Sequence, residues 1–158
     1  MHGSAETSET LKSDSFGQIL LLRDADRAVI RRDWSAAVWW ARPLARALAR
    51  REARALRQLD GLPATLLLLA SGSTRLDRSF LGGDAMYLRP PRGDLAYFQA
   101  ARRLLRQVHR LGVVHNDLAK EANWLVLDDG TPALVDFQLA VRGDPRSPWM
   151  RLLAREDL

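Results

Sequence analysis

The sequence of 158 residues predicts an α+β fold, and three observations support this prediction. Four apolar segments of strand length lie between residues 17 and 81, with one helical pattern among them. A second, strongly amphipathic helical pattern starts at residue 95. Two short apolar segments around an Asp-Asp-Gly turn come after it. This order of strands, helix, strands, helix and hairpin is typical of α+β proteins.

The N-terminal stretch contains few apolar residues. Residues 1–14 are rich in Ser, Thr and Glu and have no periodic apolar pattern, so we expect a disordered tail. Residues 17–23 and 28–32 have the length and apolar character of strands. The Asp-Ala-Asp sequence at residues 24–26 is typical of a turn, and the three segments together predict an antiparallel hairpin.

The first helical pattern begins at Pro43, which suits the first turn of a helix because it needs no N–H partner there. Apolar residues recur at helical spacing as far as Leu59, and Gly61 ends the pattern. With Trp39 and Trp40 just before it, the pattern allows two interpretations. One is a basic helix that lies on a membrane surface, and the other is an ordinary helix with one face on a core. The opposite face carries four arginines, Arg46, Arg50, Arg54 and Arg57.

Two more strands and a second helix follow. Residues 66–70 and 75–81 have the apolar character of strands, and two glycines interrupt the chain after them. The second helix is predicted to begin at Leu95, with Asp94 as its N-cap. Gly112 is well placed to end this helix.

The charge composition is unusual. The chain has 24 Lys and Arg against 19 Asp and Glu, for a net charge of +5, and all but Lys12 and Lys120 of the basic residues are arginine. This excess suits an anionic partner, although an arginine-rich solvated surface explains it equally well. No stacking aromatic motif accompanies the basic residues, so we do not expect nucleic acid as the partner.

Two function classes are excluded by composition. The chain has no cysteine, which excludes disulfides and thiol catalysis. No apolar run approaches the roughly 20 residues of a membrane-spanning helix. The N-terminus also lacks the apolar segment of a signal peptide. We therefore expect a cytoplasmic protein, with peripheral contact at the inner face of the membrane as an alternative.

Polar residues surround the C-terminal hairpin. Asn123 directly precedes its first strand, residues 124–127, and Asp136 directly follows its second, residues 133–135. We expect the two side chains to lie side by side, where their oxygen atoms suit Mg²⁺. Asp117 lies six residues before Asn123, near enough to orient a hydroxyl group beside the metal. An aspartate that accepts a hydroxyl proton while metal ions neutralise phosphate charge is typical of phosphoryl transfer.

These residues resemble the motifs of a known family. Residues 115–123, His-Asn-Asp-Leu followed by four residues and Asn, resemble the H-R-D-L-x-x-x-N catalytic loop of protein-kinase-like enzymes, and Asp-Phe-Gln at 136–138 resembles D-F-G. The nearest members are small bacterial kinases allied to RIO-type serine/threonine kinases and to lipopolysaccharide-core kinases. The strong match covers about residues 95–140 and a weaker one covers residues 16–82. The resemblance implies a two-lobed protein-kinase-like fold, with a strand-rich N-lobe (15–82) and a short or truncated helical C-lobe (83–158).

The resemblance also implies roles for the residues near the hairpin. Asp117 would be the catalytic base, and Asn123 and Asp136 would hold Mg²⁺. His115 would be a structural residue of the catalytic loop. Phe137 would pack between the two lobes.

In the first lobe, the resemblance implies a nucleotide site. The sequence Ala-Val-Ile-Arg at 28–31 is similar to V-A-I-K, so Arg31 is the expected phosphate-binding cation. Arg32 is the alternative, because a shift of one residue turns a strand side chain to the other face. Glu52 would be the acid that pairs with this cation. Hinge contacts to the adenine of ATP would fall at Phe80, Leu81 and the glycines after them.

The chain departs from the family pattern at several positions. An arginine replaces the phosphate-binding lysine, and the catalytic loop has one extra residue between Asp117 and Asn123. Asn116 and Gln138 replace the Arg of H-R-D and the Gly of D-F-G, and no G-x-G-x-x-G is present. Nothing after Ala140 resembles A-P-E, so either the C-lobe is minimal or the sequence is the front part of a longer protein.

We therefore expect an ATP- and Mg²⁺-dependent kinase. Its acceptor would be a hydroxyl group on a protein Ser or Thr or on a lipid-linked sugar. The alternative is a pseudokinase that binds a nucleotide or an anionic surface without catalysis.

Overall fold

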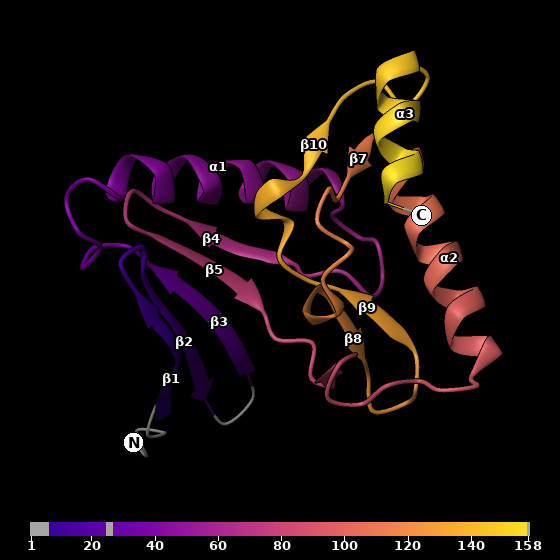
Figure 1. Ribbon diagram of the computed structural model, residues 1–158. Coiled ribbons are helices and arrows are strands. Elements are labelled where there is room, and N and C mark those ends of the chain that lie inside the picture. Colours follow the sequence, from indigo (N-terminus) through magenta and orange to yellow (C-terminus); the bar gives the residue numbers. More distant parts are fainter. Residues whose placement is uncertain (1–6, 25–26, 158) are drawn as a thin grey trace.

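The computed structural model describes residues 7–24 and 27–157, which form an α+β fold, in agreement with the class predicted from the sequence (Figure 1). The N-terminal half is built on an antiparallel sheet of five strands in the order β1-β2-β3-β5-β4. These strands are β1 (Thr7–Asp14), β2 (Gly17–Asp24), β3 (Arg27–Asp33), β4 (Leu68–Ser71) and β5 (Arg75–Ser79).

Strand β1 contradicts the prediction that residues 1–14 form a disordered tail. It pairs with β2 from Thr7, opposite Arg23, to Asp14, opposite Gly17. All eight of its side chains are exposed. An edge strand that buries neither face has no apolar alternation, and alternation is the signal by which strands are read from sequence. Residues 1–6 of the expected tail lie outside the described residues.

The other predicted strands of the sheet are confirmed. Strands β2 and β3 form the expected antiparallel hairpin, with Leu21 opposite Ile30 and Ile19 opposite Arg32. Residues 25 and 26 of the predicted turn lie outside the described residues. Strands β4 and β5 form a second antiparallel pair, and β5 also pairs with β3.

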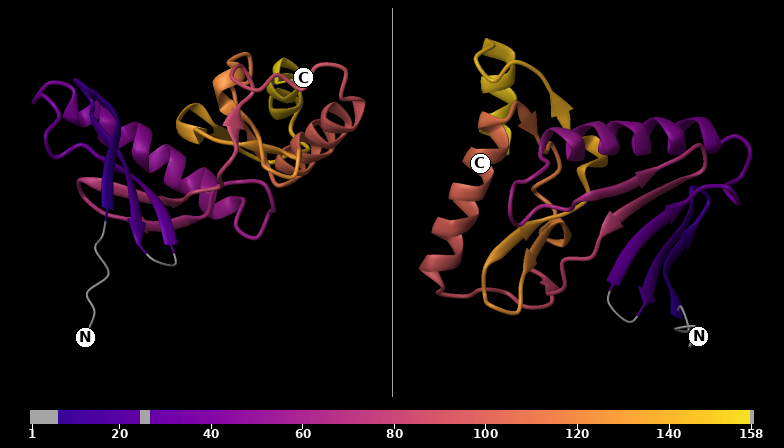
Figure 2. Two further views of the ribbon diagram at one scale, coloured as in Figure 1. Left: turned by 90° about the horizontal axis from the view of Figure 1, so that it is seen from below. Right: turned by 180° about the vertical axis from the view of Figure 1, so that it is seen from behind.

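Helix α1 (Arg42–Gln58) confirms the first predicted helix and packs against the sheet (Figure 2). Its buried face carries Ala45, Ala49 and Ala53 at intervals of four residues, which places them on one side of the helix. They pack into a cluster with Trp34 and Leu76. The opposite end of α1 contacts the 3₁₀ helix η2 (Phe137–Leu139), so α1 connects the sheet with the C-terminal half.

The C-terminal half contains the other two α-helices and two small sheets. The predicted hairpin at residues 124–135 is confirmed as part of a three-stranded antiparallel sheet in the order β6-β8-β9. The elements are β6 (Asp84–Ala85), α2 (Leu95–Arg110), β7 (Val113–Val114), η1 (Glu121–Asn123), β8 (Trp124–Val126), β9 (Pro132–Leu134), β10 (Val141–Arg142) and α3 (Pro148–Glu156). Among the described residues, every helix is too short or too polar to cross a bilayer.

Both ends of α2 match the sequence prediction. The Asp94 carboxylate accepts a hydrogen bond from the backbone N–H of Tyr97 at 3.0 Å, which makes it an N-cap. Gly112 follows the C-terminal end with φ +74°, a conformation that glycine adopts without strain. Val108 of α2 joins Leu56 of α1 and Leu134 of β9 in the largest buried apolar cluster. This cluster fixes the position of the hairpin that carries the polar residues.

Candidate active site

A pocket of about 400 Å³ lies between the five-stranded sheet and the C-terminal hairpin. Strands β1, β2 and β3 supply one wall, and the linker after β5 supplies another. The third wall comes from the segment around η1 and from the residues that follow β9. Its polar lining is Lys12, Arg32, Arg78, Ser79, Asn123, Asp136 and Gln138, and its apolar lining includes Ile19, Ile30, Leu66, Leu81, Leu125 and Val135.

The register of β3 decides which arginine faces this pocket. Arg32 lines it, whereas Arg31 lies on the other face of the sheet and binds Asp77 of β5 with two hydrogen bonds of 2.8 Å. Arg31, the expected phosphate-binding cation, therefore lies outside this pocket, and the alternative, Arg32, lines it. Successive residues of a strand point to opposite faces, so one residue of register separates the two arginines.

Glu52 of α1 forms a buried ion pair, but its closest partner was not predicted. Its side chain is fully buried, and one carboxylate oxygen accepts a hydrogen bond from Nη1 of Arg78 in β5. Nη1 of Arg32 lies 3.9 Å from the other oxygen, Oε2. Glu52 therefore pairs with the pocket arginine as expected, although more weakly than with Arg78. Residues 75–81 contain two arginines, Arg75 and Arg78, and nothing in the sequence distinguishes the one that the structure buries.

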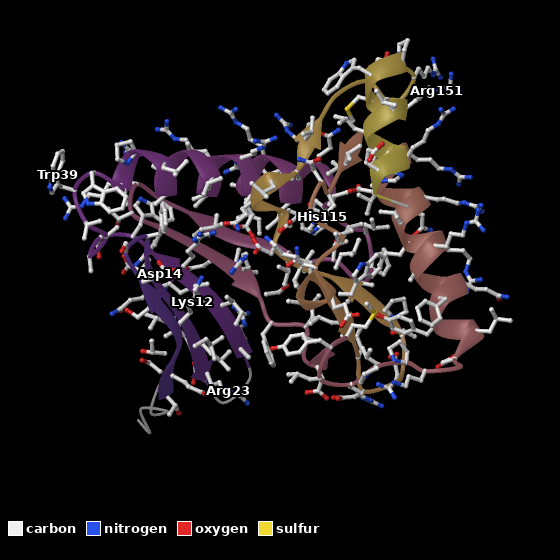
Figure 3. All side chains as sticks on the ribbon, viewed as in Figure 1. Lys12, Asp14, Arg23, Trp39, His115 and Arg151 are labelled. Atoms are coloured by element: carbon white, nitrogen blue, oxygen red, sulfur yellow. The ribbon has the colours of Figure 1, made fainter. Side chains whose placement is uncertain are left out.

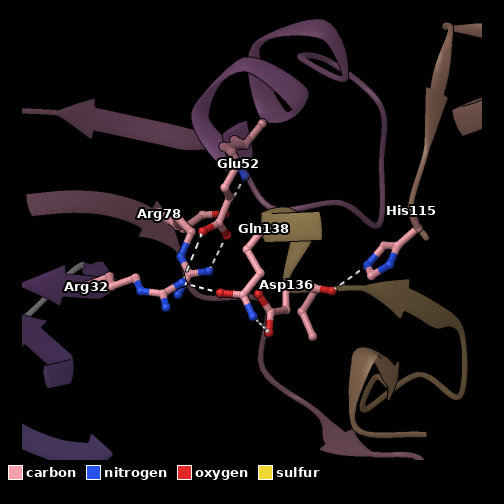
Figure 4. A network of polar contacts seen from close by, with 9 residues as sticks. Arg32, Glu52, Arg78, His115, Asp136 and Gln138 are labelled. Atoms are coloured by element: carbon pink, nitrogen blue, oxygen red, sulfur yellow. Dashed lines mark hydrogen bonds and ion pairs between the residues drawn. The ribbon is translucent and has the colours of Figure 1, made fainter. Parts of the chain in front are cut away.

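Gln138 connects the arginines to the aspartate of the hairpin (Figure 4). Its Oε1 accepts a hydrogen bond from Nη1 of Arg32 at 2.7 Å, and its Nε2 donates to Oδ2 of Asp136 at 3.4 Å. A continuous chain of polar contacts thus runs from Glu52 on α1 to Asp136. The residue that departs from D-F-G is the one that makes this connection.

Asp117 and Asn123 are held together, as the spacing predicted. Nδ2 of Asn123 donates to the backbone oxygen of Asp117 at 2.8 Å and to its carboxylate Oδ2 at 3.0 Å. Nζ of Lys120 lies 2.8 Å from the same Oδ2. This hydrogen bond with a carboxylate raises the pKa of Lys120, which therefore keeps its charge.

Asn123 and Asp136 both line the pocket, so the hairpin brings them together as expected. The backbone N–H of Val135 donates to the Asn123 carbonyl at 3.1 Å, which joins the two ends of the hairpin directly. Oδ1 of Asp136 is buried and has no hydrogen-bond partner among the described residues. A buried carboxylate oxygen without a partner is costly unless a ligand completes it.

This donor set fits a magnesium ion. The side-chain nitrogen of Asn123 makes both of its hydrogen bonds to Asp117, so its oxygen is the atom offered to a metal. Asp136 adds the buried carboxylate oxygen. The described residues contain no cluster of three or more His, Asp or Glu side chains around one point. Two protein ligands still suit Mg²⁺, because this ion usually completes its shell with water and substrate phosphates.

The backbone at Asp136 is strained. Its φ of +62° places it in the left-handed region, which residues with a Cβ seldom adopt, and such strain is concentrated at functional sites. The next residue, Phe137, is fully buried and its ring lies 4.6 Å from that of His115. Nε2 of His115 lies 2.8 Å from the carbonyl oxygen of Val135, so this nitrogen carries the proton. His115 and Phe137 together support the backbone on which Asp136 sits.

Asp157, at the end of α3, anchors the loop that carries Asp117. Its carboxylate accepts hydrogen bonds from the backbone N–H groups of His115 at 2.7 Å and Asn116 at 2.8 Å. His109 of α2 adds a third contact, at 3.1 Å. No pattern in the sequence marked Asp157, because its partners lie more than 40 residues away along the chain.

Phe80 and Leu81 lie in the linker that forms one edge of the pocket, as predicted for hinge residues. The N–H of Phe80 already donates to the backbone oxygen of Ala28 at 3.2 Å. The Phe80 ring lies under the Arg23 guanidinium, 5.5 Å from its centroid. Leu81 packs against the main apolar cluster and presents an apolar wall to the pocket.

The comparison with protein families agrees with this geometry. The family model described as the phosphotransferase enzyme family (APH) matches residues 20–147, which include every pocket residue except Leu11, Lys12 and Ile19. A search of curated protein sequences finds no significant match.

Proposed function

Because this chain belongs to the phosphotransferase enzyme family, we propose that it transfers the γ-phosphate of ATP to a hydroxyl group in a Mg²⁺-dependent reaction. Family membership supports phosphate transfer in general. We further propose that ATP is the phosphate donor, that Mg²⁺ is required and that two kinase-like lobes enclose the pocket. One main observation supports these finer proposals. Two candidate metal ligands and a candidate phosphate-binding cation line a single pocket between the sheet and the hairpin, and the candidate base Asp117 is hydrogen-bonded to one of these ligands, Asn123.

Asp117 is the proposed base. It would accept the proton of the acceptor hydroxyl as the oxygen attacks the γ-phosphate. Asn123 fixes its carboxylate from one side, and its other contact, Lys120, is 62% exposed and free to move with an arriving substrate. The carboxylate is 14% exposed, so a hydroxyl group can reach it.

Asn123 and Asp136 are the proposed metal ligands. When bound, Mg²⁺ would neutralise charge on the phosphates of the nucleotide. The chain's own contribution is to aim the two oxygens into the pocket. The strained backbone of Asp136 and its contact with Gln138 hold one of them.

Arg32 is the proposed cation for the nucleotide phosphates. A guanidinium binds phosphate oxygens as a planar fork, where the lysine of the family pattern would act as a point charge. Arg78 neutralises most of Glu52, and this frees Arg32 to exchange its contact with Gln138 for a phosphate. The backbone of Leu81 and the glycines after it is the proposed recognition site for adenine, because the N–H of Phe80 is already bonded.

The acceptor is proposed at the level of its reacting group. Asp117 requires a hydroxyl group, such as a protein Ser or Thr or a lipid-linked sugar. The competing proposal is a pseudokinase that binds the nucleotide without transferring phosphate. The departures at Arg32 and Gln138 favour it, since both lie in the site itself.

The test compares loss of the γ-phosphate from ATP and Mg²⁺ in the wild-type protein and in Asp117→Asn. Removal of a general base lowers rates by about 10²- to 10⁴-fold. We expect a reduction in this range, with nucleotide binding unchanged in a thermal-shift assay. Asp128→Asn is the matched control, because Asp128 is an exposed aspartate on the hairpin turn.

Two results would contradict the proposal. Equal rates for wild type and Asp117→Asn, both above background, would remove Asp117 from the reaction. A thermal shift with ATP and Mg²⁺ but no phosphate release from the wild type would favour the pseudokinase.

A further inference from the structure

We propose that the outer face of α1 and the loop before it bind the surface of an anionic lipid bilayer. This α1 surface consists of an aromatic part, Trp39 and Trp40, and a basic part, the arginine stripe Arg46, Arg50, Arg54 and Arg57. None of these residues lines the proposed active-site pocket. The inference therefore stands independently of the proposed phosphate transfer.

The aromatic part is unusually exposed. Trp39 is 80% exposed and Trp40 is 59% exposed, and Val38 and Leu44 beside them are exposed as well. Figure 3 shows Trp39 projecting outward at the end of α1, away from the rest of the chain. Trp40 makes an edge-to-face contact with the ring of Phe16, which holds the Trp40 side chain in place. Tryptophan rings with an apolar body and one polar N–H are favoured at the level of lipid headgroups.

The basic part lies on one side of the helix. At 100° per residue, the four arginines of the stripe fall within an arc of about 80°. Helix α1 contains six arginines in all and a single acidic residue, Glu52, which is buried and forms an ion pair with Arg78. Every charged residue on the exposed face of α1 is therefore cationic.

The stripe has no structural role that explains it. The other two arginines of α1 are bound to backbone carbonyls: Arg42 donates to Ala37 and Ser35, and Arg51 donates to Ala140. For the four arginines of the stripe, no ion pair or hydrogen bond is present within the described part of the chain. They are available to anionic groups outside the protein.

Charge complementarity and the tryptophans together point to a bilayer. Arginines near a lipid surface are attracted to anionic headgroups, and adjacent tryptophans add contact with the apolar boundary. A nucleic acid would use the arginines in the same way. It would leave the exposed Val38 and Leu44 unburied, whereas the boundary of a bilayer covers apolar and cationic groups side by side.

The test measures binding of the full chain to two kinds of vesicle by co-sedimentation. One is phosphatidylcholine alone, and the other is phosphatidylcholine with 30% phosphatidylglycerol. We expect binding to the second kind only, and weaker binding at 0.5 M NaCl because salt screens the attraction. Trp39→Ala alone, and the quadruple change of the stripe to glutamine, should each lower the affinity about tenfold or more.

Helix α2 provides a matched control. It carries four exposed arginines and no acidic residue, but it has no exposed tryptophan pair before it. Changing Arg102, Arg103, Arg106 and Arg110 to glutamine removes the same charge and should lower vesicle affinity less than threefold. An equal loss in the two quadruple variants would overturn the proposal, because binding would then follow net charge alone. Absence of binding to the anionic vesicles, or tighter binding to a single-stranded RNA that Trp39→Ala leaves unchanged, would also overturn it.

Discussion

Two neighbouring arginines of β3 make different contacts because they lie on opposite faces of one strand. Arg32 contacts Gln138 in the pocket, and Arg31 is bound to Asp77 on the other face. Gln138 in turn contacts Asp136, so Arg32 and the proposed metal ligand share one partner. The proposed nucleotide site thus contains a hydrogen bond between side chains that lie more than 100 residues apart in the sequence.

The arginine pair gives a direct test of the pocket. Arg32→Ala should weaken ATP–Mg²⁺ binding by about tenfold or more, because a charged hydrogen bond to phosphate is lost. Isothermal titration calorimetry measures this change. Arg31→Ala is the matched control and should leave the affinity within threefold, while it lowers stability through the loss of the contact with Asp77. The reverse order of effects would show that β3 has the other register.

His115 gives the fold a pH dependence. Burial lowers its pKa below the ordinary value of 6.5, more than the nearby acceptors raise it. The unfolded chain therefore takes up a proton near pH 6.5 that the folded protein does not. Stability is complete above this pH and decreases as the pH falls below it.

Urea unfolding at pH 7.5, 6.5 and 5.5 checks this dependence. We expect the free energy of unfolding of the wild type to fall through this range. His115→Gln can keep a donor toward Val135 but has no group that titrates there, so its curve should be flatter. Parallel curves for the two proteins would assign the pH dependence to other groups.

Elements with strong local sequence patterns formed where they were predicted, whereas the polar edge strand β1 was not predicted from the sequence. Helix α2 has an N-cap, an apolar stripe and a glycine beyond its end, and each is a short-range feature. Strand β1 depends on pairing with β2 and has no buried side chain.

The N-cap of α2 is testable by one substitution. Asp94→Ala removes the acceptor of the Tyr97 N–H and should lower the free energy of unfolding by about 1 kcal/mol. Asp60→Ala is the control, because Asp60 is exposed and lies just beyond α1. Chemical denaturation measures both variants. A cost for Asp94→Ala no larger than that of the control would mean that the cap contributes nothing.

The linker after β5 passes very close to β8 at Gly83. At Gly83, an added Cβ would lie 2.5 Å from the carbonyl oxygen of Val126 in β8. Gly82 has almost the same positive φ, +72° against +74°, but an added Cβ there meets nothing within 4 Å. A side chain at Gly82 would therefore cause backbone strain alone, whereas one at Gly83 would cause the same strain and a steric clash.

Alanine substitutions at the two glycines test this close approach. Gly82→Ala should cost about 1 kcal/mol from the left-handed backbone alone. Gly83→Ala should cost clearly more, about 2 to 4 kcal/mol, because the backbone of β8 must also shift. Thermal unfolding compares the two variants. Equal costs would mean that the linker does not hold β8 at the observed distance.

The sequence by itself determined the order of β2, β3, α1, β4, β5, α2, β8 and β9 and the positions of Asp117, Asn123 and Asp136 around the last two strands, because these depend on short-range patterns and on one local hairpin. Only the tertiary structure decided that Arg32 faces the pocket, that Arg78 is the close partner of Glu52 and that Gln138 joins them to Asp136. The physical reason is sequence separation. Strand register and the contacts between sheet, helix and hairpin are set by packing between residues far apart in the chain. Such packing produces no local sequence pattern from which it could be predicted.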